Sequence, residues 1–147
     1  MEPMNLPVKK LDEKAQLPEC AYEGDAGIDL RSLESASLAP FERAAVATGL
    51  AVAIPEGYAG FVLPRSGSAI KQGLSIVNAP GLIDSGYRGE LKCILINLDA
   101  KQTIRIEPGD RIAQLVIMKV ENVRLLEQAQ LSETSRGEGG FGSSGTK

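Results

Sequence analysis

The chain has 147 residues, 43% hydrophobic and 24% charged, with a net charge of −3, which is typical of one soluble globular domain. The acidic balance without a basic run argues against a nucleic-acid surface, and neither a membrane-spanning apolar run nor a signal peptide is present. The absence of histidine excludes His-dependent triads and His-ligated zinc, so a catalytic base would be a carboxylate, Lys, Tyr or Cys.

Short apolar segments separated by Pro and Gly turns follow one another along the chain and predict strands. One short helical turn is expected at residues 68–72, closed by Gly73 as its C-cap. In the run from Cys93 to Leu98 nearly every residue is apolar, which predicts a strand buried largely on both faces. The pattern indicates an all-β sandwich or barrel, with strands expected at 7–11, at the end of the acidic stretch 23–31, and at 43–54, 58–63, 74–77, 91–98, 102–106 and 111–120.

Residues 78–90 place Pro, three Gly, an acid, a Tyr and an Arg between two apolar runs. Asp84-Ser85-Gly86 suits a tight hairpin with Gly86 at positive φ. By itself this segment is equally consistent with a surface turn. A carboxylate at a hairpin tip with Tyr87 close by also suits a binding or catalytic site.

Two further segments could bind an anion. Residues 64–68 combine a guanidinium, a hydroxyl and exposed N–H groups at the start of a helical turn, with a simple capped turn as the alternative. Residues 132–147 are mostly Gly, Ser and charge, so we expect a body at 1–131 and a flexible C-terminal arm at 132–147. The arm matches a dinucleotide-binding glycine fingerprint in letters only, because no βαβ unit surrounds it.

Five ordered segments resemble the motifs of the homotrimeric dUTP diphosphatases (dUTPases). Together they extend from residue 26 to residue 145, nearly the whole chain. They are Ala26–Leu30, Pro64–Gly73, Gly81–Gly89, Gly109–Leu115 and Arg136–Gly145.

This resemblance implies a distorted jelly roll of the β-clip type, and a homotrimer whose subunits share the active sites. It also implies hydrolysis of dUTP to dUMP and pyrophosphate with Mg²⁺, which lowers dUTP and supplies dUMP for dTMP synthesis. The enzyme would be cytoplasmic, with Cys20 and Cys93 as reduced thiols. Its partners would be dUTP and its own subunits, and neither nucleic acid nor membrane.

The resemblance also implies a role for each site residue. Asp84 would activate the water that attacks the α-phosphorus, and Asp29 would hold the Mg²⁺ water shell, while the triphosphate holds the metal itself. Tyr87 would pack under the deoxyribose, Phe141 would stack on uracil, and Arg136 would bind the γ-phosphate. The remaining expected substrate-binding residues are Arg65, Ser66, Gly67, Asn78, Leu82, Ile83, Lys92, Gln114, Gly142 and Ser143.

Some alternatives stay open at this point. Asp110 and Arg111 could form an acid–base pair at a β-turn, or Arg111 could brace the site beneath Asp84. Lys92 could add a positive charge beside the hairpin. A dCTP deaminase-related enzyme, a catalytically silent regulatory trimer and a capsid-like or lectin-like jelly roll are the competing interpretations. The complete glycine-rich arm and the Gly81–Asp84 hairpin favour the diphosphatase.

Overall fold

The computed structural model describes residues 2–147, and its regular secondary structure is almost wholly strand. Its elements are β1 (Val8–Lys10), β2 (Ile28–Arg31), β3 (Ala36–Leu38), β4 (Arg43–Ala47), β5 (Leu50–Val52), β6 (Tyr58–Leu63), α1 (Ser66–Gln72), β7 (Leu74–Ile76), β8 (Gly81–Ile83), β9 (Lys92–Asn97), β10 (Ile104–Ile106) and β11 (Arg111–Lys119). The all-β prediction is therefore confirmed. None of the helices within residues 2–147 is both long and apolar enough to span a membrane.

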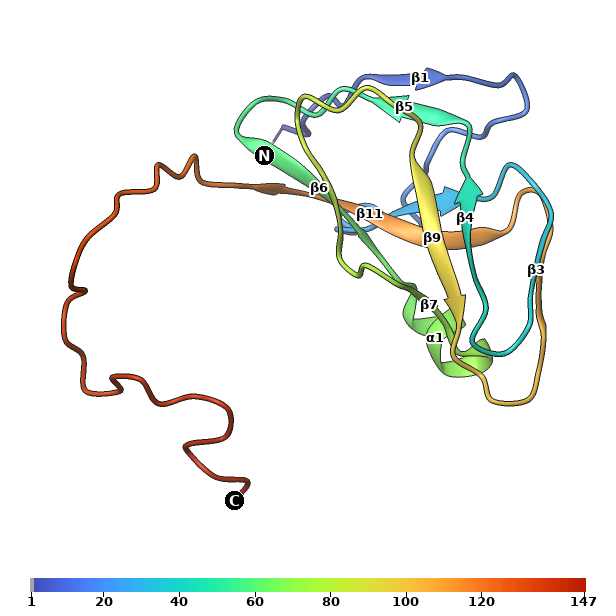
Figure 1. Ribbon diagram of the computed structural model, residues 1–147. Coiled ribbons are helices and arrows are strands. Elements are labelled where there is room, and N and C mark those ends of the chain that lie inside the picture. The colour runs from blue at the N-terminus through green and yellow to red at the C-terminus, as the bar shows by residue number, and fades with distance from the viewer. Residues whose placement is uncertain (1) are drawn as a thin grey trace.

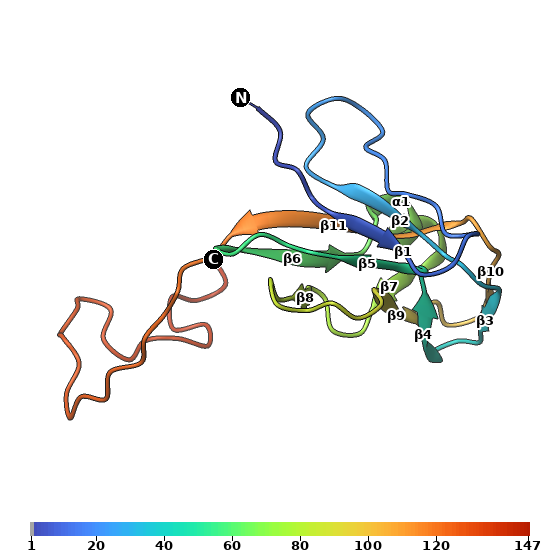
Figure 2. The same cartoon turned by 90° about the horizontal axis from the view of Figure 1, so that it is seen from above.

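Two sheets enclose the core. One has four strands in the order β2-β11-β6-β8, and the other has three in the order β4-β9-β7; β1-β5 and β10-β3 form two-stranded sheets. In Figure 2, β2, β11 and β6 lie on one side of the body and β4, β7 and β9 on the other. The fully buried Leu30 and Leu115 come from the first sheet, and Val46 and Leu95 come from the second. This shared apolar interior fixes the register of each strand, because a one-residue slip would turn its buried side chains outward.

Single glycines set two of the boundaries. The apolar run 43–54 is divided into β4 and β5 at Gly49, which has φ 72°. Gly73 ends α1 with φ 73°, and its N–H is donated to the carbonyl oxygen of Ala69. The predicted C-cap is therefore confirmed, and the helix begins two residues earlier than expected.

One burial prediction is wrong. In β9 the side chains of Cys93, Leu95 and Asn97 are buried, but Ile94 is 37% exposed, and Leu98, just beyond the strand, is 53% exposed. One face of β9 therefore stays open in the single chain. Both cysteines are free thiols, and burial raises the pKa of Cys93 to about 12.

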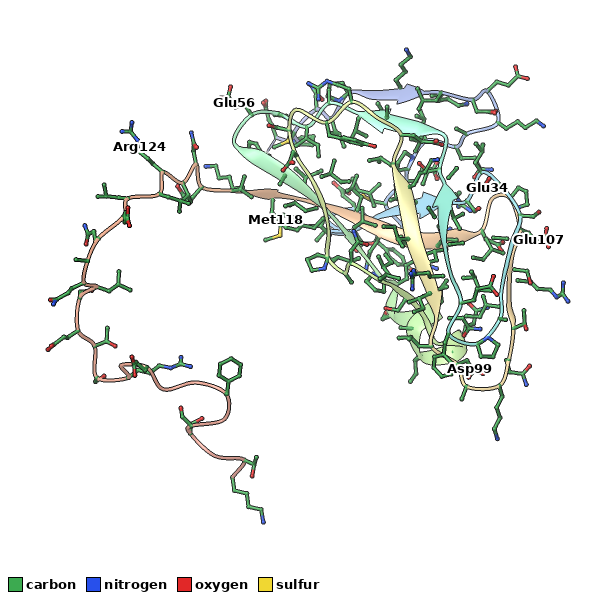
Figure 3. The ribbon with its side chains drawn as sticks, viewed as in Figure 1. Glu34, Glu56, Asp99, Glu107, Met118 and Arg124 are labelled. Atoms are coloured by element: carbon green, nitrogen blue, oxygen red, sulfur yellow. The ribbon has the colours of Figure 1, made fainter. Side chains whose placement is uncertain are left out.

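The whole C-terminal segment 120–147, which we call the arm from here on, leaves the body after β11 and extends away from it (Figure 1), so it is longer than the predicted arm at 132–147. Figure 3 places Met118 close to this exit and Arg124 on the arm itself. Leu125 is 91% exposed, and Val123, Leu126 and Leu131 are also exposed. The proposed division of the chain at residue 131 stays a prediction.

A buried amide connects β9 to the end of β3 and to the loop that follows β9. Asn97 Nδ2 donates to the carbonyl oxygens of Leu38 (2.9 Å) and Gln102 (2.7 Å), and Asn97 Oδ1 accepts from the N–H of Asp99 (2.8 Å). The backbone N–H groups of Gln102 and Lys101 in turn donate to the Asp99 carboxylate and lower its pKa. Because the folded-state pKa is lowered, this contribution to stability is present at neutral pH and is lost as the pH falls through it.

Replacing Asn97 with Leu tests this connection. The substitution leaves two carbonyl groups and one N–H without their partner in a fully buried position, and each unpaired buried group costs about 1–3 kcal/mol. We expect the free energy of unfolding, measured by urea denaturation, to fall by about 3 kcal/mol or more. Gln102→Leu, an exposed change nearby, should alter it by less than about 0.5 kcal/mol. Equal effects of the two substitutions would contradict the role assigned to Asn97.

Candidate active site

The central strand β11 places parts of the first, second and fourth motifs side by side in the sheet. Gln114 pairs with Asp29 of β2 on one side and with Leu63 of β6 on the other. The chain leaves β6 at Leu63, passes Pro64 and enters α1 through Arg65, which occupies the N-cap position. Side chains from the first, second and fourth motifs therefore meet at the end of β6.

An ion-pair network occupies this meeting point. Asp29 Oδ1 accepts from Arg65 Nε at 3.0 Å, and Asp29 Oδ2 lies 3.5 Å from Arg111 Nε. The Asp29 side chain is 17% exposed, so solvent screens these pairs less than it screens pairs on an open surface. One carboxylate thus fixes two guanidinium groups, and their terminal nitrogens remain available to another anion.

Beside this network lies a hollow of about 340 Å³, which we call the phosphate hollow. Gln114 Nε2 donates to the carbonyl oxygen of Pro64 at 2.9 Å, which fixes the Gln114 side chain at the wall. Arg65 makes no side-chain capping bond, so the capped-turn alternative does not apply. The hollow is lined by Ala21, Asp25, Ala26, Gly27, Asp29, Arg65, Ser66, Gly67 and Gln114.

The alternatives for the fourth motif can now be separated. Asp110 does not pair with Arg111: Asp110 Oδ2 accepts from the backbone N–H of Glu107 at 2.9 Å and closes the turn. Arg111 pairs with Asp29 instead of lying beneath Asp84 of the same chain. Arg111 therefore belongs to the ion-pair network beside the phosphate hollow.

Residues 81–90 form a second, separate part of the site, for which we keep the name hairpin. The predicted pairing of the two flanking strands is wrong, because β9 pairs with β4 and β7 and not with β8. β8 pairs with β6, and the loop that follows is closed by Tyr87 Oη donating to the Glu90 carbonyl oxygen at 2.9 Å. Arg88 Nη1 donates to the carbonyl oxygens of Ser85 (2.6 Å) and Tyr87 (3.0 Å), so the exposed Arg88 side chain braces the loop. Gly86 does not have a positive φ, so that expectation is wrong: the turn is closed by the Tyr87 N–H, which donates to the Asp84 carbonyl oxygen at 3.1 Å.

A cavity of about 640 Å³ opens beside the hairpin, and we call it the hairpin cavity. Asp84 has no hydrogen bond to its carboxylate from residues 2–147, whereas Glu90 Oε2 accepts from the Gly49 N–H at 2.9 Å. Lys92 Nζ lies 4.0 Å from Glu90 Oε1, so Glu90 partly neutralises the positive charge of Lys92 within the cavity. The lining residues are Ala45, Leu82, Ile83, Asp84, Tyr87, Glu90, Lys92 and Ile94.

Asn78 lies at the entrance to β8 and is not part of this lining. Its side-chain amide is next to Gly81, where an added Cβ would come within 3.4 Å of Asn78 Nδ2. Asn78 therefore faces the backbone of the strand that leads to the hairpin. The nearest atom to an added Cβ at Gly81 would be Val62 Cβ, at 3.3 Å.

The predicted arm residues lie far from both parts in the single chain (Figure 1). Arg136 Nε donates to the Gly139 carbonyl oxygen at 2.8 Å, which forms a local turn. Phe141 has φ 49° and a fully exposed ring, Gly142 has φ 84°, and the Ser143 N–H donates to the Gly140 carbonyl oxygen. The structure thus gathers one group of predicted residues at the phosphate hollow and a second group at the hairpin cavity. The predicted residues of the arm lie outside both.

Sequence reasoning missed Asp25, Arg31 and the structural role of Glu90. Asp25 lines the phosphate hollow, and its proximity to Asp29 in the sequence was an available signal. Arg31 pairs across the sheet with Arg111, a contact that depends on the strand register. Local sequence gave no indication of that register.

Comparison with known proteins adds an independent result. A family model described as dUTPase matches residues 13–145. The deoxyuridine 5'-triphosphate nucleotidohydrolase of Mycobacterium leprae (strain TN) is 56% identical over 146 residues, covering 96% of this chain and 95% of that protein. The protein of the same name from Streptomyces avermitilis is 53% identical over 143 residues, covering 97% and 82% respectively.

Two solved structures are similar across most of the chain. The dUTPase of Staphylococcus bacteriophage 80alpha with dUPNHPP has a TM-score of 0.89 and 37% identity, covering 97% of this chain and 99% of that one. A variant dUTPase from phage phi11 of S. aureus has a TM-score of 0.80 and 34% identity, covering 88% and 100%. The description of the phi11 structure names the coordination of a structural Mg(II) ion.

Gly27→Ala tests the phosphate hollow directly. A Cβ at residue 27 would collide with Gln114 Oε1, so the amide would have to leave the wall and lose its bond to Pro64. We expect the affinity for inorganic tripolyphosphate, measured by calorimetry, to fall about tenfold, as for the loss of one hydrogen bond to a charged group. Adding Gln114→Ala should remove the collision, so the effects of the two substitutions should not add. Additive effects would show that the two residues act independently.

Proposed function

This chain belongs to the dUTPase family and hydrolyses dUTP to dUMP and pyrophosphate, and we propose that Asp84 is the base that activates the attacking water. The observation that carries the proposal is the free carboxylate of Asp84 at the rim of the hairpin cavity. The other carboxylate there, Glu90, is already bound to Gly49. A base needs such a free oxygen within hydrogen-bond reach of the water.

The phosphate hollow supplies the groups that hold the triphosphate. Arg65 presents its terminal nitrogens as fork-like donors, and the start of α1 presents the N–H groups of Ser66 and Gly67. Gln114 is oriented by Pro64 toward the same hollow. Positioning and charge stabilisation of this kind account for most of the catalysis of phosphoryl transfer.

The donor set also fits Mg²⁺ that is bound mainly by substrate. Within residues 2–147 no group of three His, Cys, Asp or Glu side chains could hold a metal ion. Mg²⁺ is commonly held by substrate phosphates, one or two carboxylates and several waters. Asp29, whose oxygens face Arg65 and Arg111, would accept hydrogen bonds from those waters. When bound, the metal would neutralise charge on the triphosphate oxygens.

The hairpin and the phosphate hollow are well separated within one chain. Gly60 of β6 pairs with Ile83, which places Asp84 beside Ala59, and Arg65 follows six residues further along. At about 3.3 Å per residue, Asp84 and Arg65 lie about 20 Å apart. A base must be within about 3 Å of the water that attacks the phosphorus. This separation supports a site in which the hairpin of one subunit meets the phosphate hollow of another.

The uncovered apolar surface supports the same assembly, a homotrimer. Ile94 and Leu98 on one face of the body are partly exposed, and Leu125 on the arm is almost fully exposed. Burial of apolar surface contributes about 25 cal/mol per Å² to association. An arm reaching a neighbouring subunit would place Arg136 and Phe141 at its nucleotide, where Phe141 could stack on the base.

The first prediction from this proposal concerns Asp84. Asp84→Asn keeps the shape of the side chain and removes the base, so kcat for dUTP should fall by about 10²–10⁴-fold. The affinity for a non-hydrolysable dUTP analogue should stay within a few-fold of the original. Glu56→Gln, an exposed acid next to the same hairpin, serves as the control and should retain activity. An active Asp84→Asn enzyme would show that another group activates the water.

The second prediction concerns sharing of the site between subunits. Asp84→Asn and Arg65→Gln chains should each be inactive, but equal amounts unfolded together and refolded should regain about a quarter of the original activity. The recovery is expected because some sites then combine an intact hairpin from one chain with an intact Arg65 from another. Pyrophosphate release from dUTP is the measurement, and each variant refolded alone is the control. No recovery in mixed trimers of normal size would exclude a shared site.

A further inference from the structure

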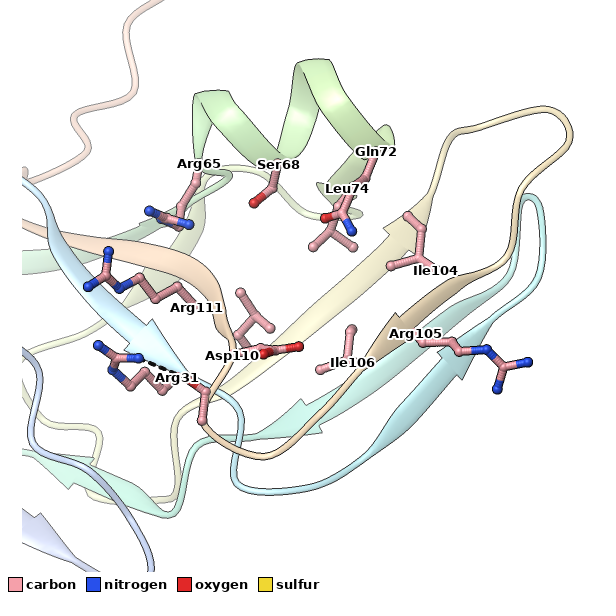
Figure 4. Close-up of a pocket in the computed structure, with 12 residues that line it drawn as sticks. Arg31, Arg65, Ser68, Gln72, Leu74, Ile104, Arg105, Ile106, Asp110 and Arg111 are labelled. Carbon is pink, nitrogen blue, oxygen red and sulfur yellow. Dashed lines mark hydrogen bonds between the residues drawn. The ribbon is translucent and has the colours of Figure 1, made fainter.

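A second cavity, of about 440 Å³, lies behind the phosphate hollow, between α1 and the start of β11. We call it the arginine pocket. Figure 4 shows the guanidinium groups of Arg65, Arg111 and Arg31 in a row along one wall, with Ser68 and Gln72 entering from α1. Arg65 lines both cavities, so the two are neighbours.

The three arginines of this row carry more positive charge than the nearby carboxylates neutralise. Arg31 and Arg111 are directly opposite each other on β2 and β11, and like charges at such positions destabilise a sheet. Arg65 and Arg111 share the single carboxylate of Asp29, while Arg31 Nη1 donates only to the Gly109 carbonyl oxygen, at 2.9 Å. Of the carboxylates nearby in residues 2–147, Asp29 alone is within ion-pair distance of this row, and Asp110 is the carboxylate that lines the pocket itself.

The other polar groups of the pocket are compatible with an anion at this wall. The Asp110 carboxylate lies apart from the guanidinium row in Figure 4 and accepts from the Glu107 N–H. The Ser68 hydroxyl and the Gln72 amide are one helical turn apart, which places them on the same side of α1. Both can donate hydrogen bonds into the pocket beside the guanidinium forks.

We propose that the arginine pocket is a second anion site, separate from the substrate site, and that it takes inorganic pyrophosphate. The proposal rests on the hydrolysis of dUTP, because that reaction releases pyrophosphate from a hollow that borders the pocket at Arg65. Pyrophosphate carries several negative charges and offers oxygens to more than one guanidinium fork. Arg111 and Arg31 would bind it on the side away from the nucleotide, with Ser68 as a further donor.

The experiment separates the two sites by filling one of them. The full-length protein is saturated with the non-hydrolysable analogue dUpNHpp and Mg²⁺, and pyrophosphate is then titrated by calorimetry. We expect one further pyrophosphate to bind for each chain. Arg31→Gln should weaken this binding about tenfold or more, as for the loss of a charge-assisted hydrogen bond, and Ser68→Ala should weaken it a few-fold.

Arg105→Gln is the matched control, because Arg105 lines the same pocket but directs its guanidinium away from the other three in Figure 4. It should leave pyrophosphate binding unchanged. If Arg31→Gln disturbs the fold by losing its bond to Gly109, as seen by circular dichroism, Ser68→Ala decides the question.

The absence of pyrophosphate binding to the analogue-filled protein, or equal weakening by Arg31→Gln and Arg105→Gln, would overturn the proposal. Turnover of dUTP is measured on the same samples. A wild-type protein without turnover would contradict the proposed function, and the pyrophosphate titration would still decide on the second site.

Discussion

The ion pairs of Asp29 with Arg65 and Arg111 are the interactions on which the geometry of the phosphate hollow depends. Without the carboxylate, Arg65 and Arg111 would repel each other at the end of β6, where Gln114 also approaches. With it, two guanidinium groups are held in place before any ligand arrives. Such preorganisation reduces the ordering that substrate binding would otherwise require. The same carboxylate remains close enough to take part in the hydration of a metal carried by the substrate.

The hairpin side is held differently, by bonds from side chains to the backbone. Arg88 and Tyr87 close the loop through carbonyl groups, which leaves Asp84 free at the rim. Within residues 2–147 the Asp84 carboxylate accepts no hydrogen bond, which suits the proposed role of Asp84 as a base. The two parts of the site are thus each complete locally, but β6 keeps them on separate regions of the subunit.

Local chemistry explains what could be predicted from the sequence. Tyr58–Leu63 lies between two clear turns, and Gly73 is the residue that a left-handed helix end requires, so the strand and the cap were foreseeable. The positive φ expected at Gly86 was wrong because residues 84–87 form a backbone turn, closed by the Tyr87 N–H on the Asp84 carbonyl oxygen, that does not require a left-handed residue at Gly86. The exposure of Ile94 was also missed, since an apolar residue on a strand face does not reveal in the sequence whether its own chain covers it. The pairing of Arg31 with Arg111 depended on register, which only the folded sheet reveals.

The arm that leaves the body at Lys119 can also be considered as a tether. The residues between Lys119 and Arg136 would have a root-mean-square span of about 20–25 Å as a flexible chain. A group held by a tether of this length has an effective concentration in the millimolar range at sites within that span. Closure over a nucleotide would then not depend on how much protein is present, as long as the subunits stay together. In the proposed homotrimer, dilution below its dissociation constant would separate the proposed lid, the hairpin and the phosphate hollow from one another in a single step.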